Sequence, residues 1–423
     1  METLIHKLKI IFTDASIRQR ILFVLGALIV FRVLAAIPIP GVDRFVLEQF
    51  FSNNEFLGLL NIFSGGGLAN LSIVLLGVGP FITASIIMQL MTVMSPRLKA
   101  LYTEEGEAGR QKFTQYSRML TLPLAILQAF GFLTLLQNQG IITDLSVFAF
   151  VANVIVVVAG SILLMWIGEL VTEYGVGNGV SIIIFAGIVA SLPSTASQLL
   201  FTFDMSQIPV YLGFTAAALM VVYGVVVMTQ AERQVPITYA KTVRGGRTYG
   251  GTTTYLPLRL NQAGVIPIIF ALSILLFPQM ILNVLATFNV SGLQAVSEAI
   301  LRFLSNTTVY AALYFGLVFV FTFFYTAVTF DPDSISKNLQ RSGAYIPGIR
   351  PGTMTAEFLG NLSTRLTLIG ALFLAGVAVL PVAMQVVTGI TALAIGGTAL
   401  LIVVTVVVDL VRRIDAQVSL REY

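Results

Sequence analysis

Ten stretches of about twenty mostly apolar residues follow one another along this chain, and each is long enough to cross the hydrocarbon core of a bilayer. A chain that is 57% hydrophobic and only 10% charged is not a soluble globular protein. Because lipid offers no partners for backbone polar groups, such stretches predict an all-α integral membrane protein with ten transmembrane helices. We place the spans at 21–38, 73–94, 118–137, 148–168, 180–200, 210–230, 263–286, 308–330, 366–384 and 390–411.

The basic residues predict which side of the membrane each loop occupies. Of the 24 Lys and Arg residues, all but Arg32, Arg44 and Arg302 lie before the first span, in or beside three long loops, or after the last span. Cytoplasmic loops carry such an excess. We therefore expect both termini to be cytoplasmic, with the three long inside loops at 95–117, 231–262 and 331–365.

A short motif indicates an internal repeat. Gly77-Val78-Gly79-Pro80 recurs as Gly264-Val265-Ile266-Pro267, and each copy opens an apolar run. Five spans lie in each half of the chain, so the second half enters the membrane from the opposite face, as in transporters with inverted repeats. We divide the chain into an amphipathic N-terminus at 1–20, halves at 21–200 and 201–411, and a tail at 412–423.

Proline inside a helix removes a backbone hydrogen bond and crowds the carbonyl four residues earlier. We therefore expect Pro80 and Pro267 to kink spans 2 and 7, and the freed backbone groups to find partners in neighbouring helices or in a cavity. This favours a central position for both spans. An ordinary packing kink is the alternative.

Aliphatic side chains at four-residue spacing are the feature that the predicted central spans share, and such spacing places two residues on one helix face. If the faces converge, they form a constriction without hydrogen-bonding groups, which can stay dry and exclude ions. Each residue by itself is also compatible with plain packing. The candidates are Val78, Ile82, Val180, Ile184, Ile269 and Ile402.

A glycine-rich segment lies outside, just before span 2, and is too short to cross the membrane. Its three consecutive glycines form a flexible hinge, on which the segment could fold back and cover an external vestibule. An ordinary connecting loop is the other interpretation. The segment comprises Asn61, Ile62, Phe63, Ser64, Gly65, Gly66, Gly67, Leu68, Ala69, Asn70, Leu71 and Ser72.

Chemistry-bearing groups are scarce. The chain has no cysteine and one histidine, His6, and shows no phosphate-binding loop and no nucleophile paired with a base, so we expect no enzyme activity, metal or cofactor. Arg32 is the clear intramembrane charge, and we expect it to face protein. Gly175-Val176-Gly177-Asn178-Gly179 is expected to end span 4 and to begin span 5.

Several stretches of the sequence resemble the SecY family, the channel subunits of the bacterial protein-conducting translocon. They include Ile37-Pro38-Ile39-Pro40-Gly41, Ala84-Ser85-Ile86-Ile87-Met88-Gln89-Leu90, Met165-Trp166-Ile167-Gly168-Glu169 and Pro347-Gly348-Ile349-Arg350-Pro351-Gly352. The resemblance extends from about 21 to 412 and implies an hourglass channel of two five-helix halves in the bacterial plasma membrane. Such a channel is a passive gated pore for secreted polypeptides and opens sideways for membrane proteins.

The resemblance also implies site residues and partners. The pore ring of the family falls on the six aliphatic residues, and its plug on 61–72. Its lateral gate lies between spans 2 and 3 and spans 7 and 8, with Thr83, Gln128 and Asn261 as polar candidates. The implied partners are SecE, SecG, the motor SecA, the ribosome, signal sequences, nascent polypeptides and membrane lipids, with Arg244, Arg247 and Arg350 in the docking loops.

Two other functions stay open at this point. Secondary transporters also use inverted repeats and broken helices, and such a protein would need a polar site at the membrane midplane, which this sequence hardly supplies. A membrane insertase or scaffold without a continuous pore is the second alternative.

Overall fold

The protein is described here from a computed structural model that covers residues 13–40, 67–68, 70–103, 105–138, 140, 142, 146–201, 208–239, 242–244, 247–249, 253–287, 300, 303, 306–388 and 391–419. Most of these residues are helical. The helices are α2 (Ala15–Ala36), α5 (Gly79–Met94), α6 (Pro96–Thr103), α7 (Gly106–Asn138), α8 (Val147–Tyr174), α9 (Gly179–Phe201), α10 (Ile208–Gln230), α11 (Ile266–Thr287), α13 (Thr307–Thr329), α14 (Pro332–Arg341), α15 (Thr353–Thr388) and α16 (Thr391–Ser419).

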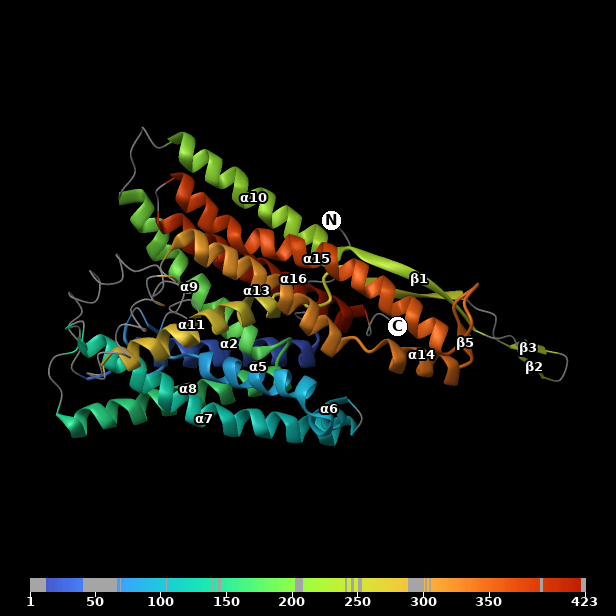
Figure 1. The fold of residues 1–423 in the computed structure, drawn as a ribbon, viewed down its shortest axis with the longest axis horizontal. Coiled ribbons are helices and arrows are strands. Elements are labelled where there is room, and N and C mark those ends of the chain that lie inside the picture. The colour runs from blue at the N-terminus through green and yellow to red at the C-terminus, as the bar shows by residue number, and fades with distance from the viewer. Residues whose placement is uncertain are drawn as a thin grey trace.

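The long helices run roughly along one direction and pack side by side (Figure 1). Each of the ten predicted spans falls on one of them. Six of the described helices are long and apolar enough to cross a membrane on their own, and the bent pair α5 and α6 passes the same test jointly. The all-α membrane fold predicted from hydropathy is therefore confirmed, and the count of ten spans is consistent with it.

The two repeat prolines were expected to kink their spans, and this expectation is wrong. Helix α5 begins at Gly79, so Pro80 lies in its first turn, and α11 begins at Ile266, so Pro267 is its second residue. The first turn of a helix has N–H groups without intrahelical partners, so proline costs no hydrogen bond there. Both prolines thus start a helix instead of bending one.

Two of the predicted inside loops are largely helical. Loop 95–117 contains α6, which bends away from α5 by 113°, and the first part of α7. Loop 331–365 contains α14 and the beginning of α15. With 36 residues, α15 is about 54 Å long at 1.5 Å per residue, so it extends well beyond a hydrocarbon core of roughly 30 Å.

The predicted inside loops that follow spans 6 and 8, at 231–262 and 331–365, form strands that hydropathy did not predict. Strands β1 (Glu232–Tyr239) and β4 (Thr253–Arg259) form an antiparallel hairpin. Strand β5 (Ala344–Tyr345) adds to β1, so that Thr238 pairs with Tyr345. Strands β2 (Thr242–Arg244) and β3 (Arg247–Tyr249) pair with each other and extend the hairpin far beyond the helices (Figure 1). We call this the sheet end of the molecule.

Three apolar cores hold the described structure together. The largest unites buried residues of both halves, from α2, α5, α8 and α9 and from α10, α11, α13, α15 and α16. The second lies within the first half and includes Leu71, Phe132 and Val157. The third, with Val235, Leu258 and Leu359, joins the sheet to the projecting part of α15. The sheet is therefore anchored by its own hydrophobic contacts.

The most exposed apolar helix surfaces match contact with lipid. On α2, Leu22 and Ile29 are 58% and 65% exposed, and on α10 Met220 is 75% exposed. Arg32 is also exposed, yet it interacts with another group of the protein, so the expectation that it faces protein stays a prediction. It lies one turn before the end of α2, and a long arginine side chain near a helix end can reach the membrane interface along the apolar surface.

Candidate functional site

Two glycine turns, one from each half, stand at the centre of the molecule. Gly77 and Gly264 have φ values of +57° and +62°, in the left-handed region that glycine adopts without strain. The residue after each glycine, Val78 or Val265, is buried in the core that joins the halves. Helices α5 and α11 begin one residue later, so the repeated motif has the same local structure twice.

The carbonyl groups of both glycines accept hydrogen bonds from side chains. The Ser161 hydroxyl on α8 donates to the Gly77 oxygen at 2.8 Å. The Asn261 side-chain amide donates to the Gly264 oxygen at 3.2 Å. This agrees with the expectation that neighbouring groups satisfy the backbone where these spans begin, although the cause is the turn and not a proline kink.

The six predicted ring residues lie in the same core. Val78, Ile82, Ile184, Ile269 and Ile402 are at most 7% exposed, and all five belong to the cluster that joins the halves. Val180 is partly buried and packs against that cluster. Two residues come from α9, one from α16, and the others from α5, α11 and the turn before α5. The structure thus brings together residues that are far apart in the sequence; their role as a ring stays a prediction.

A cavity of about 240 Å³ opens beside this core. Its walls come from the beginnings of α9 and α11, the ends of α10 and β4, and the sides of α13 and α16. Ile182 and Val265 belong to both the cavity wall and the apolar core. Asp409 and Arg413 form an ion pair of 2.8 Å in the wall. The cavity therefore has a wall of mixed character, in which charged and amide side chains lie beside aliphatic residues of the core.

Two of the three predicted gate residues lie on the helices of spans 2 and 3, and the third lies just before the helix of span 7. Thr83 on α5 and Gln128 on α7 are 9% and 6% exposed, and Asn261 precedes α11 and is 9% exposed. Helices α5 and α7 both pack against α11. Thr83 donates to the Gly79 oxygen of its own helix at 3.0 Å, so its hydroxyl does not link two helices among the described contacts. The gate assignment stays a prediction.

The predicted plug lies partly outside the described residues, because 61–66 and 69 are not among them. Its last part is firmly attached. Leu68 and Leu71 are buried in the second core, the Asn70 amide donates to the Ala35 oxygen at 3.3 Å, and Ser72 pairs with Pro38 in an antiparallel bridge. The end of the segment is therefore attached to the bundle beside the end of α2.

The docking arginines occupy the sheet end. The backbones of Arg244 and Arg247 pair in register in the β2–β3 hairpin. Arg350 is exposed in a turn that is secured by a 2.9 Å hydrogen bond from the Thr355 hydroxyl to the Arg350 carbonyl. Because β5 pairs with β1, the two loops that carry these arginines form one unit, which the sequence did not predict.

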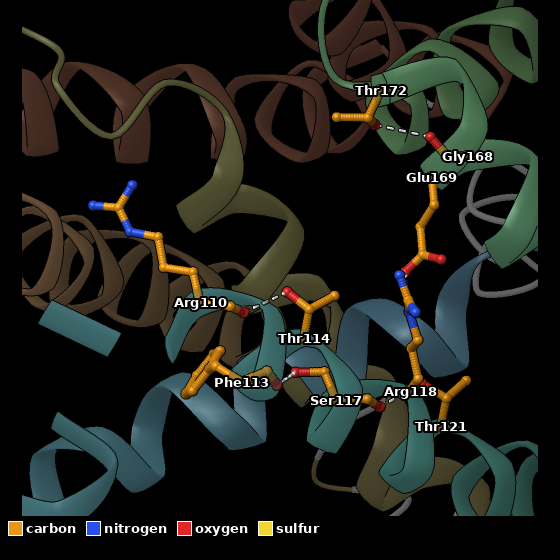
Figure 2. A network of polar contacts seen from close by, with 9 residues as sticks. All are labelled: Arg110, Phe113, Thr114, Ser117, Arg118, Thr121, Gly168, Glu169 and Thr172. Atoms are coloured by element: carbon orange, nitrogen blue, oxygen red, sulfur yellow. Dashed lines mark hydrogen bonds and ion pairs between the residues drawn. The ribbon is translucent and has the colours of Figure 1, made fainter. Parts of the chain in front are cut away.

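A polar network joins α7 to α8 (Figure 2). Arg118 on α7 donates through its Nε to Glu169 on α8 at 2.7 Å. Close to it, the Thr172 hydroxyl donates to the Gly168 oxygen at 2.8 Å. The sequence analysis did not single out Ser161 or Thr172, because serine and threonine are common in membrane helices and carry no motif.

Comparison with known proteins agrees with this architecture. A sequence model of the SecY family matches residues 72–411. The protein translocase subunit SecY of Mycobacterium bovis is 42% identical to the chain over 96% of each protein. That of Vibrio cholerae is 40% identical, over 97% of this chain and 93% of the relative.

Solved structures share the fold. A structure described as a protein-conducting channel superposes with a TM-score of 0.65 over 95% of this chain and 93% of its own, at 18% identity. Sec61 in the canine ribosome-channel complex from the endoplasmic reticulum gives a TM-score of 0.61 over 95% and 93% of the two chains, at 17% identity. Because the family model covers most of the chain and the identity to these relatives is high over nearly their full length, the resemblance seen in the sequence is confirmed and the chain belongs to the SecY family.

Proposed function

We propose that this protein is the central subunit of a protein-conducting channel in the bacterial plasma membrane. It acts as a passive gated pore through which unfolded polypeptides are secreted and from which membrane proteins enter the lipid sideways. The observation that carries the proposal is that six aliphatic residues from both halves lie in or against one apolar cluster, in a chain of the SecY family.

The chemistry of this centre suits a polypeptide and not an ion. Its aliphatic side chains offer no hydrogen bonds that could replace the hydration shell of an ion, and a narrow apolar constriction stays dry. Branched aliphatic side chains can still move apart around an extended chain of varied composition. No cluster of His, Cys, Asp or Glu suited to a metal occurs among the described residues. A secondary transporter would need coordinating groups at this depth.

The remaining parts follow from this arrangement. Residues 21–200 and 201–411 form the two inverted halves, and residues 61–72 close the pore as a plug that is anchored at its Ser72 end. The lateral gate opens between α5 and α7 on one side and α11 and α13 on the other, with Thr83, Gln128 and Asn261 beside it. The sheet end is cytoplasmic, as are both termini, because the basic loops cluster there.

Several partners fit the exposed surfaces. The sheet end presents Arg244, Arg247 and Arg350 to the motor SecA and to the ribosome, whose RNA phosphates attract arginine. Solved structures that share the fold include the yeast Ssh1 complex bound to the yeast 80S ribosome. The exposed apolar faces of helices such as α2 and α10 are available to SecE, SecG and lipid, and signal sequences enter at the lateral gate.

Crosslinking of an arrested chain tests the proposal directly. The protein has no cysteine, so Ile82→Cys and Ile402→Cys each introduce a single thiol. A secretory polypeptide that is arrested in transit and carries one cysteine should form a disulfide with either variant. Met220→Cys, on the 75% exposed face of α10, is the control and should form none. Equal crosslinking at all three positions, or none at the two central ones, would contradict a central pore.

A further inference from the structure

The glycine-rich turn between α8 and α9 has no role in the proposed function, but neighbouring helices contact it closely. The turn runs from Gly175 to Gly179 and connects the end of α8 to the helix that carries Val180 and Ile184. Helix α2 contacts it on one side, where Arg20 donates to the Gly175 oxygen at 3.3 Å. Helix α16 lies on another side, where the Arg413 side chain comes close to Gly177.

The turn glycines are needed for close approach and for backbone conformation. A methyl group at Gly175 would come within 2.7 Å of Val24. Gly177 has a φ of +90°, which L side chains avoid. A methyl group at Gly179 would collide with the Gly168 carbonyl of α8 and come within 2.8 Å of the Val171 Cβ. Helix α9 therefore starts in direct backbone contact with α8.

Thr172 makes the polar connection at this contact. Its hydroxyl oxygen accepts a hydrogen bond from the Gly179 N–H at 2.8 Å and donates to the Gly168 carbonyl at 2.8 Å. The first N–H groups of a helix have no partner within the helix, and Gly179 is buried. One hydroxyl thus binds the first residue of α9 to the helix before it. Asn178 caps the same first turn, because its side-chain oxygen accepts a hydrogen bond from the Ser181 N–H at 3.2 Å.

This connection determines where the first turn of α9 points. Val180 follows Gly179 directly, and its Cγ2 lies 3.2 Å from the position that a methyl group at Gly168 would occupy. Ile184 is one turn further along the same face and is fully buried in the central core. A small shift or rotation at Gly179 therefore moves both side chains.

We infer that Thr172 is a positioning residue for the channel: its hydroxyl holds the beginning of α9 against α8 and so keeps Val180 and Ile184 facing the central aliphatic cluster. The inference rests on the proposed function, because the contact between α8 and α9 is important for the channel only if Val180 and Ile184 help to close a pore. Without the hydroxyl, the Gly179 N–H lacks its partner, and the first turn of α9 can move away from α8.

The experiment compares the resting ion conductance of purified channels in planar bilayers. Thr172→Val keeps the shape of the side chain and removes the hydroxyl, whereas Thr172→Ser keeps the hydroxyl. We expect T172V to conduct about tenfold more at rest than the wild type, the factor that corresponds to a hydrogen bond worth ~1.4 kcal/mol. T172S should restore the low conductance. Thr114→Val is the matched control, because the Thr114 hydroxyl donates within its own helix, to the Arg110 oxygen at 3.0 Å.

The outcomes separate this inference from the proposed function when Ile184→Asn is measured beside them. A raised resting conductance in I184N and in T172V, with a low conductance in T172S, supports both the proposed pore and the role of Thr172. Leak in I184N with a tight T172V channel overturns the role of Thr172 and leaves the pore intact. A tight I184N channel overturns the ring, and the role of Thr172 with it. If T172V does not accumulate, Gly168→Ala presses on Val180 without removing a polar group, and a tight G168A channel would then overturn the inference.

Discussion

The Ser161 hydroxyl lies 2.8 Å from the Gly77 carbonyl oxygen and donates a hydrogen bond to it across 84 positions of sequence. In the other half, the Asn261 side-chain amide donates a hydrogen bond to the Gly264 carbonyl oxygen at 3.2 Å. These two residues are only three positions apart in the sequence. The two turns thus have the same backbone conformation, but their glycine carbonyls accept hydrogen bonds from different donors. Each carbonyl needs a hydrogen-bond donor, and in each half this is the group that the local packing brings close.

The Ser161 bond should be important for stability. Ser161 is 1% exposed, so Ser161→Ala leaves the Gly77 carbonyl buried without this donor, which costs about 1–3 kcal/mol. We expect S161A to lower the thermal unfolding midpoint of the detergent-solubilised protein. Ser197→Ala is the control, because the exposed Ser197 hydroxyl donates only within its helix, to the Pro193 oxygen. Identical midpoints for both variants would show that the bond contributes nothing.

Glycines on the fourth helix of each half should differ in their tolerance of alanine. A methyl group at Gly160 on α8 would collide with the Ile73 carbonyl, and one at Gly370 on α15 would come within 2.8 Å of the Leu260 oxygen. Overpacking of this kind costs about 1–3 kcal/mol. We expect G160A and G370A to be destabilised, with the larger effect for G160A, in the same unfolding measurement.

The control for these glycine variants lies on α15 itself. A methyl group at Gly376 meets no atom within 4 Å, so Gly376→Ala should raise helix stability by about 0.5–1 kcal/mol. Destabilisation of G376A to the same degree as G370A would mean that close approach to Leu260 is not the cause.

A polar side chain in the aliphatic centre should make the resting channel leak. Ile82 is 7% and Ile402 1% exposed within the shared core, and an asparagine at either position offers hydrogen bonds to water in a constriction that otherwise stays dry. We expect Ile82→Asn and Ile402→Asn to raise the resting ion conductance, and Ile82→Leu to leave it low. Unchanged conductance in both asparagine variants would count against the ring.

The beginning of α14 should respond to pH through Asp331. Partial burial raises the pKa of this carboxyl, but hydrogen bonds from the Ser334 hydroxyl, the Ser334 N–H and the Asp333 N–H, together with the charge of Lys99, have the larger and opposite effect, so the pKa lies below the usual value of an aspartate. A depressed pKa means that the stabilisation is present at neutral pH and is lost as the pH falls below about 4.

Hydrogen exchange of the α14 amides at several pH values checks this. At neutral pH, Asp331→Ala should speed the exchange, because loss of an N-cap costs about 0.5–2 kcal/mol, whereas Asp331→Asn keeps an acceptor and should change it less. The difference between the wild type and D331N should shrink as the pH falls below about 4 and Asp331 becomes protonated. A difference that persists at low pH would show that the charge of Asp331 is not involved.

Charge reversal at Arg350 should separate motor coupling from channel assembly. Arg350 is exposed, and its backbone is fixed by Thr355 and by the neighbouring glycines Gly348 and Gly352 at φ values of +83° and +102°. We expect Arg350→Glu to assemble normally in vesicles but to lose SecA-driven translocation. Arg341→Glu, on the exposed surface of α14, carries the same charge change and should translocate. Normal translocation by R350E would refute the docking role.

Much of the fold could be predicted from the sequence because the membrane makes hydropathy decisive. Each of the ten apolar stretches falls on a helix, and the Gly-Val repeat marks two equivalent turns. The boundaries were less certain. Span 2 was expected from residue 73, but the chain forms turns up to Val78 and α5 begins at Gly79, since a proline is better tolerated in the first turn of a helix than in its interior.

The sheet end shows what local patterns could not predict. Residues 344 and 345 form a strand only because β1, more than a hundred positions earlier, offers its edge to them. Neither segment has the long alternating pattern by which a strand is recognised. The two basic loops therefore seemed independent, although the structure joins them in one sheet with its own apolar core.

The sequence alone determined that this chain crosses the membrane many times in two related halves, because the cost of burying polar groups in lipid leaves no other place for such long apolar stretches. Only the tertiary structure decided which side chains complete the centre. Ser161 and Thr172 act through bonds to carbonyl and amide groups of Gly77 and Gly179. A hydroxyl finds such partners through the packing of whole helices, and that packing is not encoded in any short stretch around it.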